Sequence, residues 1–302
     1  MLKNETRNRL KKNGYLDHIL HILAVGRYRG LYDDFRYAIS KERGKAKLFN
    51  GFTINLPNNM EGIGKELLLH GIHEPTATRE YEKFLKPGDQ ILEAGANIGY
   101  YVAVAEKTLD SRVNFLAIEP DPDVFEILKV NTSSIKNRIQ LQMVAASDQK
   151  GESIFFQSSS SNLGSLRKSR RADDKSTIVQ TKTIDGLCED SEFRPTVIRM
   201  DIEGAEILAL RGARQVLQKF TPRLFIELHP SLMTDDEVRE VLDIFESFSY
   251  SNFTVIDRSY DQPCALRRME RCQAKKMNIA EIKVFLAERY VTALGLLSHP
   301  SA

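Results

Sequence analysis

The stretch QILEAGANIG, residues 90–99, decides the fold. Its first half, Gln90 to Ala94, is a short apolar run typical of a buried strand. Its second half is a glycine turn that leads into a predicted helix ending near Thr108. Glycine permits a tight turn whose backbone N–H groups face a ligand at the start of the helix. The stretch therefore predicts the first strand–turn–helix unit of a ligand-binding parallel sheet.

An acidic residue closes the next predicted strand. The run Val113 to Ile118 predicts that strand, and Glu119 follows it, twenty residues after Gly99. A carboxylate at this spacing can accept hydrogen bonds from the hydroxyl groups of a ribose. The sequence therefore predicts a cofactor that contains adenosine.

The glycine spacing distinguishes between adenosine cofactors. The turn has the pattern Gly-x-x-x-Gly, without the GxGxxG pattern that admits a pyrophosphate, which disfavours a dehydrogenase. Glu93 precedes the turn, where a carboxylate would repel a pyrophosphate but suit the cationic amino and sulfonium end of S-adenosylmethionine (SAM). We therefore predict SAM as the cofactor.

The chain beyond residue 120 continues to alternate strands and helices. Such alternation predicts a mostly parallel α/β sheet with helices on both faces. Two long basic or serine-rich stretches, 151–183 and 262–276, interrupt the pattern. The predicted helices are 121–131, 205–219 and 235–248, and the predicted strands are 139–145, 153–157, 178–182, 196–200, 223–228, 253–256 and 282–286.

Four ionisable residues follow two of the predicted strands. Asp201 and Glu203 come after strand 196–200, whereas Glu227 and His229 lie at the end of strand 223–228. Carboxyl ends of parallel strands share one edge of a sheet, so these side chains should converge there. An alcohol that accepts a methyl group must lose a proton, and a base or a metal ion can assist this step. The group fits either route, with Mg²⁺ as the metal considered. Glu206 is interpreted as a first-turn acid of the following helix.

The motifs together resemble those of the FkbM-type SAM-dependent methyltransferases. The resemblance covers residues 71–250, and it is carried by FLKPGDQILEAGANIGYYVAVAEK (84–107), AIEPDP (117–122), VAASDQKG (144–151), IRMDIEGAEILALRGA (198–213) and FIELHP (225–230). It implies a Rossmann-like, seven-stranded, mostly parallel sheet of the class I methyltransferase type. It further implies O-methylation of a hydroxyl on a saccharide, a glycolipid or another hydroxylated small molecule. The family motif usually opens with Asp, where this chain has Glu93.

The resemblance also implies roles for individual residues. Asp201 and Glu203 would lie at the methyl-transfer site, with Glu227 and His229 beside them. The segment NLGSL (162–166) resembles a family segment that covers the substrate pocket, and we predict a substrate lid over 158–176. The residues implied to bind SAM are Glu93, Gly95, Ala96, Asn97, Gly99, Glu119, Ala146 and Ser147.

Composition, charge and apolar runs indicate the class of protein and its division into segments. The 302 residues carry a net charge of +2, and no apolar run is long enough to span a membrane. The three cysteines are too few and too scattered for a disulfide framework, so we predict a cytoplasmic protein without a secretory signal. We predict a basic helical extension over 1–50, a methyltransferase domain over 51–290 and a C-terminal tail over 291–302. The extension presents either a surface for an anionic partner or a solvated helix face.

Two other functions compete with the O-methyltransferase. An RNA methyltransferase would use the basic N-terminus and basic loops, and a non-catalytic SAM-binding module would lack an acid at 201 or 203; both acids are present. His73 and Glu74 precede the predicted first helix of the domain, and their segment could close over the cofactor. The acceptor and the oligomeric state do not follow from the sequence.

Overall fold

The computed structural model describes residues 37, 44–57, 62–135, 138–157, 164–167, 175–258, 273–288 and 291–300. Most of the predicted helical extension, most of the predicted lid and most of the second basic stretch lie outside these residues. Within the described ranges, no helix has the length and apolar character that crossing a membrane requires.

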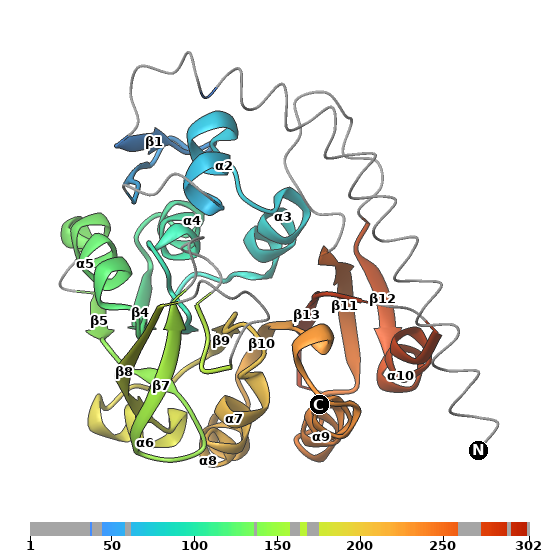
Figure 1. The fold of residues 1–302 in the computed structure, drawn as a ribbon. Coiled ribbons are helices and arrows are strands. Elements are labelled where there is room, and N and C mark those ends of the chain that lie inside the picture. Colours follow the sequence, from blue (N-terminus) through green and yellow to red (C-terminus); the bar gives the residue numbers. More distant parts are fainter. Residues whose placement is uncertain are drawn as a thin grey trace.

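An eight-stranded sheet forms the centre of the fold (Figure 1). Its spatial order is β12-β11-β13-β10-β9-β3-β4-β5. The five strands from β10 to β5 are parallel, whereas β13 is antiparallel to both of its neighbours and β12 is antiparallel to β11. The predicted mostly parallel α/β fold is confirmed. In chain order the strands are β3 (Asp89–Ala94), β4 (Val113–Ile118), β5 (Ile139–Gln142), β9 (Val197–Met200), β10 (Arg223–Leu228), β11 (Asn252–Asp257), β12 (Lys275–Asn278) and β13 (Leu294–Ser298).

Helices cover both faces of the sheet. Successive residues of a strand point to opposite faces, so Ile91 and Phe115 pack with one helix group while Leu92 and Leu116 pack with the other. The first group comprises α2 (Ile63–His70), α3 (Pro75–Phe84), α4 (Tyr100–Thr108) and α5 (Pro122–Asn131). The second group comprises α6 (Ile184–Asp190), α7 (Glu206–Arg211), α8 (Arg214–Phe220), α9 (Asp235–Ser247) and α10 (Ile279–Glu288).

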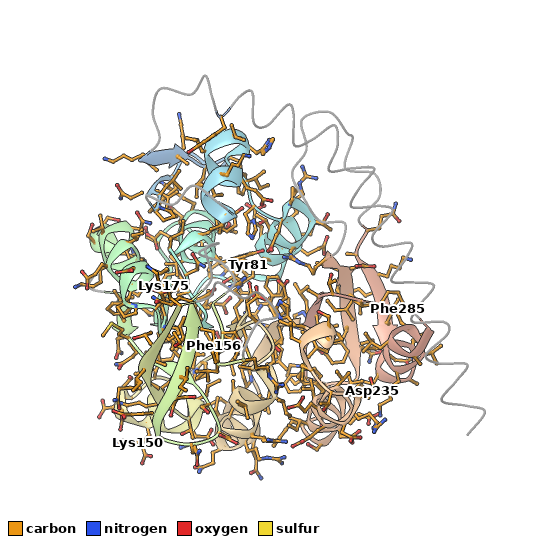
Figure 2. The ribbon with its side chains drawn as sticks, in the orientation of Figure 1. Tyr81, Lys150, Phe156, Lys175, Asp235 and Phe285 are labelled. Carbon is orange, nitrogen blue, oxygen red and sulfur yellow. The ribbon has the colours of Figure 1, made fainter. Side chains whose placement is uncertain are left out.

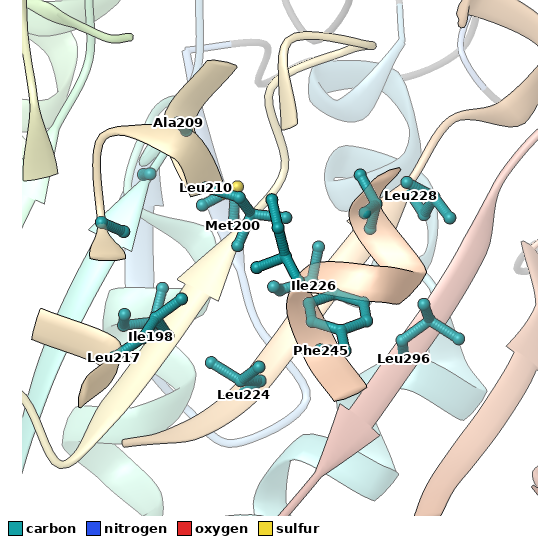
Figure 3. Close-up of a cluster of buried hydrophobic side chains, with 14 of the residues drawn as sticks. Ile198, Met200, Ala209, Leu210, Leu217, Leu224, Ile226, Leu228, Phe245 and Leu296 are labelled. Atoms are coloured by element: carbon teal, nitrogen blue, oxygen red, sulfur yellow. The ribbon is translucent and has the colours of Figure 1, made fainter. Parts of the chain in front are cut away.

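Figure 3 shows part of the second core, where side chains of β9, β10 and β13 meet those of α7, α8 and α9. Ile198, Ile226 and Phe245 are 2% exposed or less, which means that this layer is closed to water. Close packing on both faces holds the strand ends rigidly, and the strand ends carry the predicted site residues.

A smaller sheet stands beside the main one. It has the order β6-β8-β7, and its β7 and β8 form an antiparallel pair (Figure 1). In Figure 2, Lys150 marks one end of this pair and Lys175 marks the other. Farther upstream, β1 and β2 form an antiparallel pair. These strands are β1 (Lys45–Lys47), β2 (Thr53–Asn55), β6 (Ala145–Ala146), β7 (Gly151–Gln157) and β8 (Lys175–Lys182).

Several sequence-based predictions differ from the structure. The sheet implied to have seven strands has eight, and the expected strand 139–145 is divided between β5 and β6, which belong to different sheets. The stretch 282–286, expected as a strand, belongs to α10, because Ile279, Ile282 and Leu286 recur at helical spacing and are buried together. The expected helix 205–219 is divided between α7 and α8 at Gly212, where an added Cβ would lie 2.2 Å from the Ser147 carbonyl oxygen. The expected tail 291–302 contains β13, which lies between β10 and β11 inside the sheet.

Candidate active site

A cleft that is open to solvent lies at the carboxyl ends of β3, β4, β9 and β10, and its volume together with the open space at its mouth is about 940 Å³. The direction of strand order reverses between β3 and β9, which is where parallel α/β sheets bind ligands. Of the predicted site residues, Gly95, Ala96, Asn97, Glu119, Ala146, Asp201, Glu203 and Glu227 line the cleft. Glu93, Gly99 and Ser147 are not among the lining residues, whereas His229 lies within 3.9 Å of Asp201, Glu203 and Glu227.

The glycine turn is held tightly against its neighbours. Gly95 has a φ of +80°, and an added Cβ would lie 2.0 Å from the backbone oxygen of Asp201. The Gly95 and Ala96 N–H groups donate to the Ile118 carbonyl oxygen at 3.0 and 2.9 Å. A glycine is required at position 95 because the turn packs directly on the backbone after β9. The cofactor turn and the predicted catalytic segment are therefore joined through their main chains.

Glu119 is anchored by the same turn. Its Oε2 accepts a hydrogen bond from the Asn97 backbone N–H at 2.8 Å, and its Oε1 accepts one from the Asp121 backbone N–H at 3.0 Å. Burial raises the pKa of the Glu119 carboxyl from 4.5 to about 7, with Asp121 and Asp201 adding to the rise. The carboxyl thus has a fixed orientation at the edge of the cleft.

We expect Glu119 to make stability depend on pH. Its pKa in the folded chain lies above its ordinary value of 4.5, so ionisation of this group costs folded-state stability as the pH rises from about 4.5 through 7. Relative to the parent, Glu119→Gln should therefore gain about 3 kcal/mol of unfolding free energy across this interval, since one pKa unit corresponds to about 1.4 kcal/mol. Urea unfolding at a series of pH values measures the change, with Glu126→Gln on the exposed side of α5 as control. A constant difference between Glu119→Gln and the parent would contradict the prediction.

Glu93 is buried and is not among the residues that line the cleft. Its carboxylate is 1% exposed, and its Oε1 accepts a 2.6 Å hydrogen bond from Nη1 of Arg199. The Arg199 guanidinium lies over the Tyr101 ring, 3.8 Å from the ring centroid, and its Nη2 donates to Asp201 at 3.2 Å. The contact between Glu93 and the cationic end of SAM stays a prediction, and in this structure the partner of Glu93 is Arg199. Asp201, the second acid that Arg199 contacts, does line the cleft.

Arg199 was missed by the sequence reasoning. It occupies a strand whose other residues are apolar, and a charged residue inside such an apolar run is the signal that could have identified it. Its partners lie on β3 and α4, however, and no spacing rule connects those elements with β9.

The acid–histidine cluster consists of Asp201, Glu203, Glu227 and His229. The His229 Nε2 atom lies 3.9 Å from Oδ1 of Asp201, 3.5 Å from Oε2 of Glu203 and 3.6 Å from Oε1 of Glu227. The neighbouring carboxylates raise the pKa of His229, whereas burial opposes that rise. The structure thus brings together the residues that the sequence placed at two separate strand ends.

Glu206 supports the cluster from α7. Its Oε1 lies 2.8 Å from Nδ1 of His229 and also accepts a hydrogen bond from the Gly204 backbone N–H at 2.9 Å. Glu206 therefore combines the predicted first-turn role with a second one, because it fixes the orientation of the imidazole ring.

The described part of the predicted cover segment contacts the same site. Gly164, Ser165 and Leu166 line the cleft, and the Ser165 hydroxyl donates to the Glu203 carbonyl oxygen at 2.7 Å. Glu203 itself has a φ of +52°, which is uncommon for a residue other than glycine. The hydroxyl thus holds a strained turn next to the cluster.

The segment before α3 forms the opposite wall. His73 and Glu74 line the cleft, and Glu74 has a φ of +48°. Glu74 accepts a hydrogen bond from the Tyr101 hydroxyl at 2.9 Å and pairs with His73 and Arg258. Arg258 also contacts Oε2 of Glu227 at 3.0 Å. This wall is therefore tied to the acid–histidine cluster by charge pairs.

Comparison with known proteins agrees with this geometry. The sequence matches the methyltransferase FkbM domain over residues 93–251, which includes the glycine turn, Glu119 and the whole acid–histidine cluster. The chain belongs to the FkbM methyltransferase family. The predicted family resemblance is thereby confirmed.

Individual relatives of this FkbM-family chain are distant. It is 26% identical to the hexuronic acid methyltransferase AglP of Haloferax volcanii over 149 residues, which is 49% of this chain and 59% of that protein. Among solved structures, it is similar to methyltransferase FkbM from Methylobacillus flagellatus KT, with 17% identity, a TM-score of 0.42 and coverage of 80% of this chain and 55% of that one. A SAM-dependent O-methyltransferase from Thermotoga maritima shows 11% identity and a TM-score of 0.40, with coverage of 82% and 72%.

Proposed function

We propose that this FkbM-family chain is a SAM-dependent O-methyltransferase that methylates a hydroxyl group of a saccharide, a glycolipid or another hydroxylated small molecule. One observation carries the proposal: the glycine turn with Glu119 and the three acids of the acid–histidine cluster line the same cleft. The turn and Glu119 suit the adenosine and ribose of SAM. The cluster suits the removal of a proton from an acceptor.

The reaction requires both halves of the cleft. In methyl transfer, the acceptor oxygen attacks the methyl carbon of the sulfonium, the carbon–sulfur bond breaks, and the hydroxyl proton must pass to a nearby base. The carboxylates of Asp201 and Glu203, which lie 3.9 and 3.5 Å from Nε2 of His229, offer acceptors for that proton. Bases held at such a position typically accelerate a reaction 10²–10⁴-fold. The products are S-adenosylhomocysteine and a methyl ether.

The chemistry of the cleft favours a hydroxyl over a carboxylate as the accepting group. A carboxylate acceptor is already ionised at neutral pH and needs no base. It would also enter a cleft lined by Glu74, Glu119, Asp121, Asp201, Glu203 and Glu227. The family relative acts on a hexuronic acid according to its name, which supports a saccharide as the acceptor class. We propose methylation of a sugar hydroxyl within that class.

The same lining opposes the nucleic-acid alternative. An RNA phosphate backbone would approach a row of carboxylates, whose repulsion acts against binding. The basic stretches that favoured this alternative lie largely outside the described residues. A purely non-catalytic module would not need a histidine held among acids at the cleft.

SAM affinity tests the proposal at Glu119. Removing a charge-assisted hydrogen bond typically costs about 1.5–3 kcal/mol, so Glu119→Ala should weaken SAM binding roughly tenfold or more. Isothermal titration calorimetry measures the effect, and Glu126→Ala on α5 serves as the matched control because that acid is 66% exposed. Unchanged affinity in Glu119→Ala would remove the cofactor assignment.

A further inference from the structure

Three atoms of the acid–histidine cluster point toward one another without hydrogen bonds. They are Oδ1 of Asp201, Oε1 of Glu227 and Nε2 of His229, and a ligand atom from each of these residues lies within 4.8 Å of the other two. Within the described part of the chain, none of these three atoms takes part in a hydrogen bond, although His229 is only 5% exposed. The Nε2 atom of His229 faces carboxylate oxygens of Asp201, Glu203 and Glu227 at 3.5–3.9 Å, so the imidazole nitrogen lies in a nest of oxygen ligands.

The second polar atom of each of these three side chains already has a partner within the protein. Asp201 uses Oδ2 to pair with Arg199 at 3.2 Å, Glu227 uses Oε2 to pair with Arg258 at 3.0 Å, and His229 uses Nδ1 to contact Glu206 at 2.8 Å. Metal ligands are characteristically oriented by outer partners in this way, including a carboxylate behind the histidine. We propose that Asp201, Glu227 and His229 form a binding site for one divalent transition-metal ion.

Distances support a common ion. Nitrogen and oxygen ligands lie about 2.0–2.2 Å from such ions, so two ligands of one ion are roughly 3–4.4 Å apart. The His229 Nε2 atom lies 3.9 Å from Asp201 Oδ1 and 3.6 Å from Glu227 Oε1, which is within that range. These separations are too long for good hydrogen bonds. The ligand atoms of all three residues lie within 4.8 Å of one another, so an ion between them is within reach of each residue.

The ligand set selects the kind of ion. Mg²⁺ prefers an all-oxygen shell and keeps several water molecules. An imidazole nitrogen favours transition metals, whereas carboxylates also suit Mn²⁺. A site with one histidine and two carboxylates therefore fits Mn²⁺ or a related transition-metal ion better than the Mg²⁺ considered from the sequence. An ion at this place would act as a Lewis acid on an acceptor hydroxyl, and this role, unlike the binding itself, rests on the proposed function.

Mn²⁺ binding tests the site directly. The full chain is titrated with Mn²⁺, and free Mn²⁺ is followed by electron paramagnetic resonance. We expect one bound Mn²⁺ per chain, and we expect Asp201→Asn and Glu227→Gln each to weaken binding about tenfold or more. Glu240→Gln, which alters an acid on α9 paired with Arg211, should bind Mn²⁺ like the parent.

Several outcomes would overturn the site. Mn²⁺ that stays free in the presence of the parent, or that binds equally to the parent and both ligand variants, excludes it. Displacement of Mn²⁺ by an equal concentration of Mg²⁺ excludes the transition-metal assignment. Circular dichroism checks that each variant is folded, and a rise in the parent's melting temperature with Mn²⁺ gives a measurement that needs no variant. SAM titration of the same samples separates the proposals: SAM binding without Mn²⁺ binding overturns only the metal site, and Mn²⁺ binding without SAM binding overturns only the proposed function.

Discussion

Asp201→Asn and His229→Ala should each lower the rate of methyl transfer about 10²–10⁴-fold, because each removes a member of the group that prepares the acceptor hydroxyl. SAM affinity should stay nearly unchanged, since Glu119, the proposed ribose contact, and the glycine turn are intact. Turnover is measured with radiolabelled SAM and a panel of sugar acceptors, and affinity is measured by calorimetry.

The control for these variants is Glu240→Gln, which changes an acid of α9 that does not line the cleft. Parental rates in both cluster variants would show that deprotonation occurs elsewhere. A failure of both variants to fold would show that the cluster serves structure instead. Chelation adds a further distinction: activity that is lost with EDTA and restored by Mn²⁺ requires an ion, whereas activity that survives EDTA leaves the side chains as the base.

Arg199→Met should lower the free energy of unfolding by about 3–5 kcal/mol, because it leaves the buried Glu93 carboxylate without its partner. The Arg199 and Glu93 side chains are 5% and 1% exposed, so water cannot replace the lost contact. Methionine keeps much of the hydrocarbon volume over the Tyr101 ring, so the loss reports mainly on charge. Urea unfolding provides the measurement.

Arg211→Met is the matched control. Arg211 pairs with Glu240 at 2.6 Å, but both side chains are 37% exposed. Exposed ion pairs contribute only about 0–1 kcal/mol. Equal losses in the two variants would mean that the buried pair has no special role. A destabilised but folded Arg199→Met would also show whether Asp201 keeps its orientation, because its methyl-transfer rate can be compared with that of Asp201→Asn.

The parallel half of the fold could be predicted closely from the sequence. The strands 113–118 and 223–228 agree with β4 and β10, because unbroken apolar runs between clear turn signals leave little choice of boundary. In the antiparallel edge, the predicted strand 253–256 agrees with β11, but β12 and β13 were not predicted. An apolar run such as 282–286 fits a strand or a buried helix, and only tertiary packing decided for α10.

The site residues likewise divide into those that the sequence predicted and those that it did not. Asp201, Glu203, Glu227 and His229 could be placed together because the carboxyl ends of adjacent parallel strands must meet. The charge partners Arg199, Arg258 and Glu74 could not be placed at the site from the sequence. Their contacts with Glu93 and Glu227 join elements that are far apart in the chain. Glu93 illustrates the limit: its position before the turn was predicted, but the direction of its side chain depends on Arg199, 106 residues later.

The place of β13 affects how this sheet is assembled. β13 separates β10 from β11, and its partners on β10 begin some seventy residues earlier, with Leu224 opposite Ser298. During synthesis, β10 and β11 emerge well before the strand that joins them, and each then presents an unpaired backbone edge of the kind that recruits other chains. Shortening the chain before residue 294 would make that exposure permanent. The last strand of the described chain thus covers both edges at once, and we expect chains that lack it to aggregate more readily.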